Sequence, residues 1–300
     1  MMTRTLALCA FLLAATAPTV FAQDKTEGGY ALAWTHTLQE QVGQVAVKEH
    51  LFPGWSFMVH ECSAGEAMAY WQERMRTMGG NAKGSNPVRV TGAIMPGQEG
   101  GTMLIFATAK MDRSADGVRI TVAFALNDST AAPEAPGMAA AVHDMAVQVN
   151  RAVVQAQVDA QDKRYAKIGE QLEDAQRQQA SVARKKSDAG KQLDKVNAEQ
   201  ARLARKRTDL QDKLNRLEEA QRLMPDPRNA KDIAGVRQDL ISVEHDIVKQ
   251  QKAEADALAD LNKHREQVPE AEENQQESAV ERERATKEME ALKHKLGSIR

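Results

Sequence analysis

Three side chains in the first half of the chain have types and spacing that suit a soft metal ion. Met58, His60 and Cys62 alternate along one short segment, so they share a face if that segment is a β-strand. Thioether, imidazole and thiolate groups bind Cu(I) or Zn(II). One strand supplies too few ligands, however, and the spacing places no second Cys/His pair beside it. The alternative is that this face packs on a helix, with Cys62 as a small buried hydrophobe. We predict no metal site and keep these three residues as the candidates.

Sequence motifs with a known catalytic mechanism are missing from the chain. His60-Glu61-Cys62 is not the zinc-protease pattern H-E-x-x-H, and there is no P-loop, G-x-S-x-G or dinucleotide fingerprint. Ser63 is explained by a role as a helix cap, so it is not assigned as a nucleophile. The sequence therefore predicts a protein that is not an enzyme, with no catalytic residues and no cofactor.

The elements around these residues predict one α+β head domain at residues 53–150. Ser63 and Glu66 form a capping box that opens a helix, and Gly79-Gly80 ends it. Glycine-rich connections between the later strands indicate antiparallel pairing. Pro133 and Pro136 precede a helix whose apolar side chains can cover the sheet. The expected order is β-α-β-β-β-α, an antiparallel sheet with helices on one face, and the expected strands are 55–61, 88–94, 103–110 and 118–126.

The N-terminal 52 residues divide into two parts. Residues 1–22 have the pattern of a secretory signal peptide: Arg4, an apolar run from Leu6 to Val20, and small residues before the cleavage point at Ala22. An uncleaved anchor is the alternative. Residues 23–52 form an N-terminal segment, of which 30–51 is expected to be helical or mixed. Cleavage leaves Cys62 as the only thiol, which excludes a disulfide framework. We expect secretion, into the bacterial periplasm or cell envelope.

Residues 151–300 carry the heptad pattern of a coiled coil, interrupted at 224–229. Pro225 and Pro227 cannot continue a helix, and Asp226 and Asn229 suit a turn and the next N-cap. The helix of the head is expected to continue directly into these heptads. The sequence therefore predicts a long antiparallel coiled-coil hairpin, and a parallel dimer through the tail is the alternative.

A fold-back at this turn pairs the layers of the two arms so that their residue numbers have a constant sum. Polar layers and Pro269 predict a weak middle. The expected pairs are Leu217 with Val236, Leu214 with Leu240, Leu210 with Val243, Gln200 with Glu254, Leu193 with Leu261, Lys186 with Val268, Gln179 with Gln275, Tyr165 with Met289, Val158 with Leu296 and Val154 with Ile299.

The order of elements resembles that of uncharacterised secreted proteins from Bacteroidetes, which have a short βαβββα head and a long helical tail. The matching features are the helix segment Ala67-Met68-Ala69-Tyr70-Trp71, the paired strands 104–109 and 118–126, and the tail. The resemblance implies the fold, and it brings no catalytic residues.

These patterns favour a non-enzymatic structural or interaction protein whose hairpin serves as a spacer or docking arm. The formal net charge is −2 and both signs are mixed along the helices, so no nucleic acid is expected. The partner is expected to be another envelope protein, and the chain a monomer or a coiled-coil homo-oligomer without an integral membrane segment after cleavage. The alternative is a small-ligand or metal carrier that uses the sheet of the head. The predicted partner-binding residues, at the turn, are Leu223, Met224, Asp226, Arg228 and Asp232.

Overall fold

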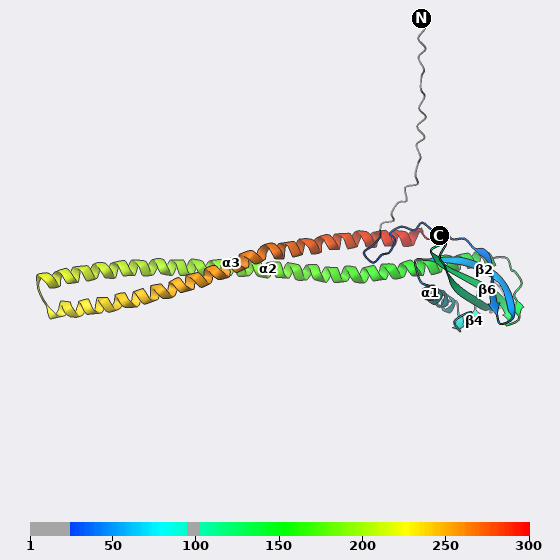
Figure 1. Cartoon of the computed structure of the whole chain (residues 1–300), viewed down its shortest axis with the longest axis horizontal. Coiled ribbons are helices and arrows are strands. Elements are labelled where there is room, and N and C mark those ends of the chain that lie inside the picture. Colours follow the sequence, from blue (N-terminus) through cyan, green and yellow to red (C-terminus); the bar gives the residue numbers. More distant parts are fainter. Residues whose placement is uncertain (1–24, 95–102) are drawn as a thin grey trace, which may run out of the picture. The chain divides into compact units, whose positions relative to one another are not determined.

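The computed structural model describes residues 25–94 and 103–300 of the 300-residue chain, so the expected signal peptide at 1–22 lies outside the described residues. The fold is α+β, with an antiparallel sheet of seven strands and three helices (Figure 1). The chain divides into two compact units. We call Met1–Gln161 together with Lys287–Arg300 the head unit, and Asp162–Thr286 the arm unit.

The strand order in the sheet is β1-β2-β6-β5-β4-β3, and β7 pairs with β6. The strands are β1 (Gln41–Val47), β2 (His50–His60), β3 (Asn81–Lys83), β4 (Val88–Ala93), β5 (Met103–Asp112), β6 (Gly117–Asn127) and β7 (Thr130–Ala131). The helices are α1 (Ala64–Thr77), α2 (Met138–Leu223) and α3 (Pro227–Ser298). The four predicted strands correspond to β2, β4, β5 and β6, and all of them pair antiparallel.

Helices α1 and α2 cover one face of the sheet, as predicted. The capping box is present: Glu66 N–H donates to Ser63 Oγ at 3.3 Å, and Ser63 N–H donates to Glu66 Oε2 at 2.8 Å. Because the capping box sets the residue at which α1 begins, it also determines that the apolar side chains of α1 face the sheet. The buried cluster on this face contains Trp71 and Met75 from α1, Val142, Met145 and Val149 from α2, and Val118, Ile120, Val122 and Phe124 from β6.

A second, smaller buried cluster lies on the other face of the sheet. The hairpin of β1 and β2 folds over this face, and the Phe52 and Phe106 rings pack with centroids 5.4 Å apart. Gly54 permits the close approach, because a Cβ at this position would collide with the carbonyl oxygen of Val122.

The expectation of helical or mixed structure for residues 30–51 is wrong for its second half, which forms β1. The residues alternate only over Val45 and Val47, which are buried in the second cluster. Pairing with β2 over the whole of β1 outweighs the weak local pattern. Leu126 ends the predicted strand 118–126, where its alternation with Val118, Ile120, Val122 and Phe124 predicts an inward side chain. It is instead 63% exposed, at a register shift between Ala125 and Asn127 where β7 joins β6.

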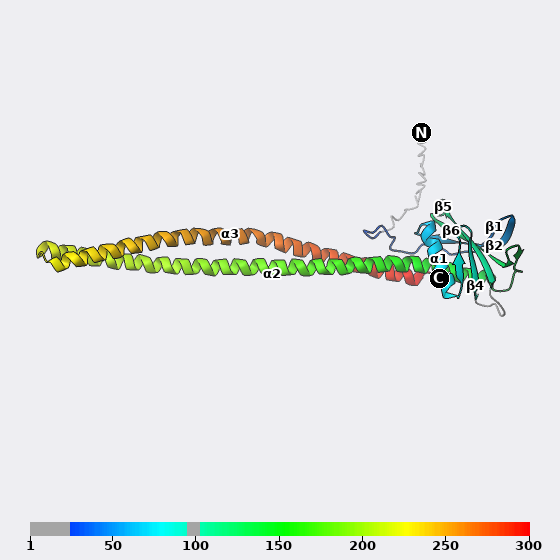
Figure 2. The ribbon, with the colours of Figure 1, turned by 90° about the horizontal axis from the view of Figure 1, so that it is seen from below.

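In the arm unit, α2 and α3 run antiparallel beside each other, so the hairpin prediction is confirmed (Figures 1 and 2). At the turn, Asp226 is the N-cap of α3, since its Oδ1 accepts from Arg228 N–H at 2.7 Å. Pro227 occupies the first helical position, where a missing N–H costs nothing. The predicted N-cap at Asn229 is therefore wrong by one turn.

The predicted register holds in the half of the arm nearer the turn. Leu214, Val236 and Leu240 form one buried cluster, with Leu210, Leu217 and Ile233 packed against it. Gln200 Nε2 donates to Glu254 Oε2 at 2.7 Å, which confirms the predicted polar layer.

Farther from the turn the register differs from the prediction. Val268 borders a hollow of about 180 Å³ beside Ala180 and Ala183, where Lys186 was expected to face Val268. Arg282 stacks over the Tyr165 ring at 5.5 Å. Pro269 lies inside α3 and lacks the N–H that an α-helix would use at this level, and Figures 1 and 2 together show the two helices winding around each other.

Among the described residues, no helix combines the length and the apolar character that crossing a membrane requires.

Candidate functional site

The structure separates Cys62 from the other two candidate metal ligands, Met58 and His60. Strand β2 ends at His60, and Glu61 has a φ of +59°, so the alternation that would bring Cys62 onto the same face is broken. Met58 is half-buried, whereas the ring of His60 is buried. Among the described residues, no group of three or more His, Cys, Asp or Glu side chains has a metal-binding arrangement.

Cys62 sits in a half-buried position directly before α1. Burial raises the pKa of its thiol to about 12, and the carboxylates of Glu66 and Glu61 act in the same direction. The thiol therefore stays protonated at neutral pH, and since the thiolate is the reactive form, it is a poor nucleophile and a poor ligand.

His60 instead belongs to an aromatic cluster with two residues of the N-terminal segment. Its ring stacks on that of His36, with centroids 3.8 Å apart and planes 5° apart. Trp34 contacts both rings edge-on, at 5.0 Å and 5.8 Å. The stack fastens the segment before β1 to the end of β2.

Burial and the neighbouring His36 lower the pKa of His60 to about 4, while Glu61 and Asp116 act in the opposite direction. Desolvation also lowers the pKa of His36. Both rings are thus neutral at pH 7, and stacking brings no charge repulsion. The His60 Nδ1 atom is buried without a hydrogen-bond partner among the described residues.

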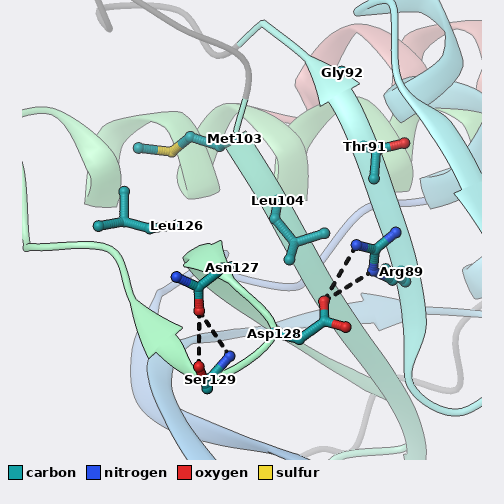
Figure 3. Close-up of a pocket in the computed structure, with 9 residues that line it drawn as sticks. All are labelled: Arg89, Thr91, Gly92, Met103, Leu104, Leu126, Asn127, Asp128 and Ser129. Carbon is teal, nitrogen blue, oxygen red and sulfur yellow. Dashed lines mark hydrogen bonds and ion pairs between the residues drawn. The ribbon is translucent and has the colours of Figure 1, made fainter.

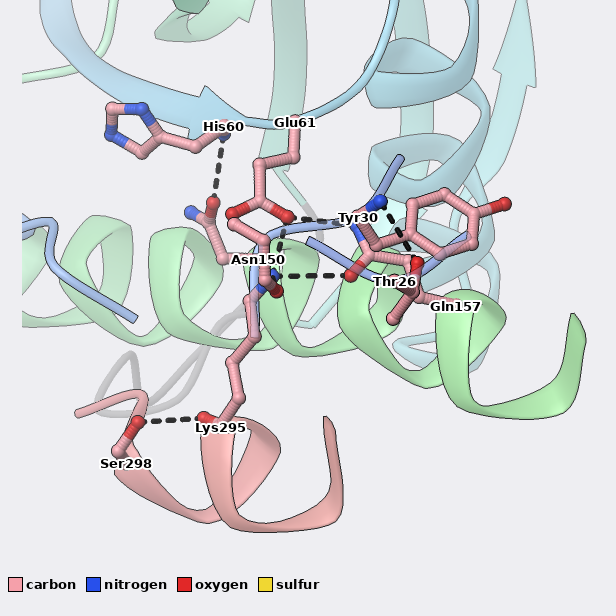
Figure 4. A network of polar contacts seen from close by, with 9 residues as sticks. Thr26, Tyr30, His60, Glu61, Asn150, Gln157, Lys295 and Ser298 are labelled. Atoms are coloured by element: carbon pink, nitrogen blue, oxygen red, sulfur yellow. Dashed lines mark hydrogen bonds and ion pairs between the residues drawn. The ribbon is translucent and has the colours of Figure 1, made fainter. Parts of the chain in front are cut away.

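Next to this cluster lies a buried polar network centred on Lys295 of α3 (Figure 4). The Lys295 side chain is fully buried, and its Nζ donates to Ala31 O at 2.7 Å, Glu61 Oε2 at 2.5 Å and Gln157 Oε1 at 3.2 Å. Gln157 Nε2 donates to the same Glu61 oxygen at 2.9 Å. We call these four residues the lysine network; it joins the N-terminal segment, the end of β2, α2 and α3.

Asn150 of α2 makes a second link to β2, and its side chain is fully buried. Its Oδ1 accepts from His60 N–H at 3.0 Å, and its Nδ2 donates to Met58 O at 2.9 Å and to Ala146 O at 2.8 Å. Both donor hydrogens of the amide and one lone pair of its oxygen are therefore used within the head unit. The amide thereby ties α2 to the end of β2.

The sequence analysis predicted neither the lysine network nor the hydrogen bonds of Asn150. Asn150, Gln157 and Lys295 interrupt the apolar stripes of α2 and α3, and this was the available signal. Polar residues at apolar positions indicate a buried network only when their partners are known. Of their partners, Ala31 lies in the N-terminal segment, which has no clear period, and Glu61 stands at the last position of a predicted strand, so neither was marked as a partner.

The face of the sheet opposite the helices carries an open groove of about 550 Å³ over β4, β5 and the turn after β6 (Figure 3). Arg89 Nε donates to Asp128 Oδ1 at 3.2 Å across it, and Met103, Leu104 and Leu126 contribute apolar surface. Both charged groups are therefore already paired with each other.

The turn of the arm unit presents the predicted partner-binding residues to solvent. Leu223 and Met224 are each 76% exposed, although both are large and apolar. Arg228 and Asp232 are also exposed, whereas the Asp226 carboxylate is occupied as the cap of α3. The structure thus places the five residues within one turn and the start of α3. We call them the tip.

The sequence matches no protein-family model, and a comparison with curated proteins also finds no match.

Proposed function

We propose that this chain is a non-enzymatic interaction protein whose two-helix arm holds the tip out as a contact for another protein. The observation that carries the proposal is the pair Leu223 and Met224, each 76% exposed at the end of the hairpin. Adjacent large apolar residues exposed at a turn are typical of contact surfaces, because solvent exposure of such side chains is otherwise unfavourable.

The construction of the arm supports this role. At 1.5 Å per helical residue, Asp162–Leu223 extends on the order of 90 Å. Its apolar side chains are buried in the contact between α2 and α3, and its outer surface carries charges of both signs. An arm of this kind provides reach and little enclosed surface. With the expected signal peptide at 1–22, we place the partner in the bacterial periplasm or cell envelope.

A photo-crosslinking residue in place of Arg228 in the full chain tests the proposal in the native host. We expect one discrete adduct, and we expect its loss in a variant with Leu223→Ser and Met224→Ser. The matched control places the same crosslinker at Glu266, which is exposed in the middle of α3. Adducts that form equally from both positions, or that persist in the serine variant, would overturn the role of the tip.

A second candidate function is small-ligand binding in the groove of Figure 3, which the open volume of about 550 Å³ favours. A molecule with an anionic and an apolar part would compete with Asp128 for Arg89 and cover Leu126. Native mass spectrometry of chain isolated from its host tests this. A bound species that is retained in Met224→Ser and lost in Arg89→Ala would support the carrier function over the tip; chain without a bound species would count against it.

A further inference from the structure

The outer edge of β1 is an unprotected strand edge. β1 is the last strand on its side of the sheet, and no described residue pairs with the edge that faces away from β2. A free edge presents backbone N–H and C=O groups that can template another strand. Natural proteins usually block such edges with charges, proline, bulges or short length.

None of these protections is present in β1. Its sequence, QVGQVAV, is uncharged and lacks proline, and its register with β2 runs without a shift from Gln41 to Val47. The opposite edge of the sheet provides a comparison within the same molecule. There β3 is only three residues long and carries Lys83, as expected of an edge that must stay free.

Strand β1 is also complementary to itself under a two-fold rotation. In an antiparallel pairing of two copies about Gln44, all seven residues find partners, and Val42 of one copy lies opposite Ala46 of the other. The face of β1 that bears these residues is exposed, with Val42 at 88%. Just beyond the strand, Glu40 is paired with His143 and Lys48 enters the hairpin turn with a φ of +55°, so the flanking charges lie outside the pairing.

We propose that two copies of this chain associate through antiparallel β1–β1 pairing centred on Gln44, which joins the two head sheets into one. The interface is isologous, since the same seven residues contribute from both copies. Pairing of one strand edge buries little surface, so the dimer is weak and its population depends on concentration. The pairing does not involve the tip and is independent of the function proposed for it.

Two double variants of the full chain test the register directly. Val42→Lys with Ala46→Lys places like charges opposite each other at two positions of the dimer. Val42→Lys with Ala46→Glu places opposite charges at the same two positions. Both substituted side chains are exposed, so the head unit tolerates them, and circular dichroism with Trp fluorescence checks its folding. Sedimentation velocity over micromolar concentrations measures the dimer dissociation constant.

We expect the unchanged chain to form a concentration-dependent dimer. The dimer dissociation constant should rise at least about tenfold in the Lys/Lys variant and stay nearly unchanged in the Lys/Glu variant. Hydrogen exchange should show that β1 amides directed away from β2 gain protection as concentration rises. A monomer at every concentration overturns the proposal. If both double variants weaken the dimer equally, the proposed register is wrong. If neither weakens it, the dimer contact lies elsewhere in the chain. The same conclusion follows if the β1 amides gain protection only after an extended peptide is added. Should either double variant misfold, Gln44→Lys puts a single like pair on the two-fold axis and is read in the same way.

Discussion

Lys295 shows how one buried charge can hold several segments of the head unit together. Its ammonium group has three acceptors, from Ala31, Glu61 and Gln157, and its side chain is fully buried. Removing one partner of a buried ion pair leaves the other charge without compensation. We expect Lys295→Met to lower the free energy of unfolding by about 3–5 kcal/mol, as measured by denaturant unfolding.

Lys293→Met is the matched control, because Lys293 is exposed two residues earlier on α3. It should change the stability little. Combining Lys295→Met with Glu61→Gln removes both charges and should recover part of the loss. If Lys295→Met were no more destabilising than Lys293→Met, the lysine network would not stabilise the head unit.

The stacked histidines make stability depend on pH. His60 has its pKa lowered from 6.5 to about 4, so the unfolded chain takes up a proton there before the folded chain does. The free energy of unfolding therefore falls as pH drops from about 6.5 to about 4, by up to about 3 kcal/mol from His60. His60→Phe keeps an aromatic ring and removes the titration. We expect it to flatten the pH dependence of unfolding in this window.

His245→Phe is the control for this comparison, because His245 is an exposed residue of the arm unit. This variant should leave the slope of the free energy of unfolding against pH, between pH 6.5 and pH 4, as it is in the unchanged chain. Carboxylates contribute to this slope in every variant alike. Parallel slopes in the His60 and His245 variants would show that the stack contributes nothing to the pH dependence.

At the scale of elements, the start of α1 depends on a few hydrogen bonds. Ser63 and Glu66 satisfy each other's backbone N–H groups, which have no partner inside the helix. Ser63→Ala removes the cap and should cost about 1 kcal/mol in denaturant unfolding. Ser278→Ala is the comparison, since the Ser278 hydroxyl only bonds back to Asn274 O within α3. Equal stability of the two variants would contradict the importance of the cap.

The arm unit shows how far a heptad pattern determines a pairing. Near the turn, the layers of Leu214 with Leu240 and of Gln200 with Glu254 form as predicted, because a short connection leaves the two helices one register. Near Pro269 the partners shift, and Val268 lies beside Ala180 and Ala183. The heptad pattern thus determines that the two helices pair, and Pro269 marks where their register departs from the predicted one.

At the scale of the whole molecule, the end of the chain completes the core of the head unit. Ile299 is fully buried in the same cluster as Trp71 and Val154, although the arm unit separates it from them in sequence. Ile299→Ala should therefore destabilise the head by about 2–5 kcal/mol. All three Trp residues precede Leu126, so Trp fluorescence during denaturation follows the head.

Ile241→Ala makes the same chemical change at an exposed position of α3, where Ile241 is 59% exposed. It should leave the Trp-monitored transition in place. If Ile299→Ala behaved in the same way, the segment that follows α3 would not belong to the core of the head.

Much of the fold could be read from local patterns in the sequence. The capping box at Ser63, the alternation along β6 and the heptads on both sides of Pro225 each depend on residues within a few positions of one another. Such patterns express the periods of helix and strand, which backbone geometry imposes everywhere. The exposed tip also followed from them, since two prolines mark a turn and Leu223 and Met224 stand beside it.

Only the tertiary structure decided which distant segments meet. It made β1 a strand, because β2 supplied the partner that residues 41–47 lacked in their own pattern. It also brought Ala31, Glu61, Gln157 and Lys295 together, and turned His60 from a candidate ligand into half of a stacked pair with His36. Contacts between residues so far apart have no period, so their energy appears only once the whole chain has packed.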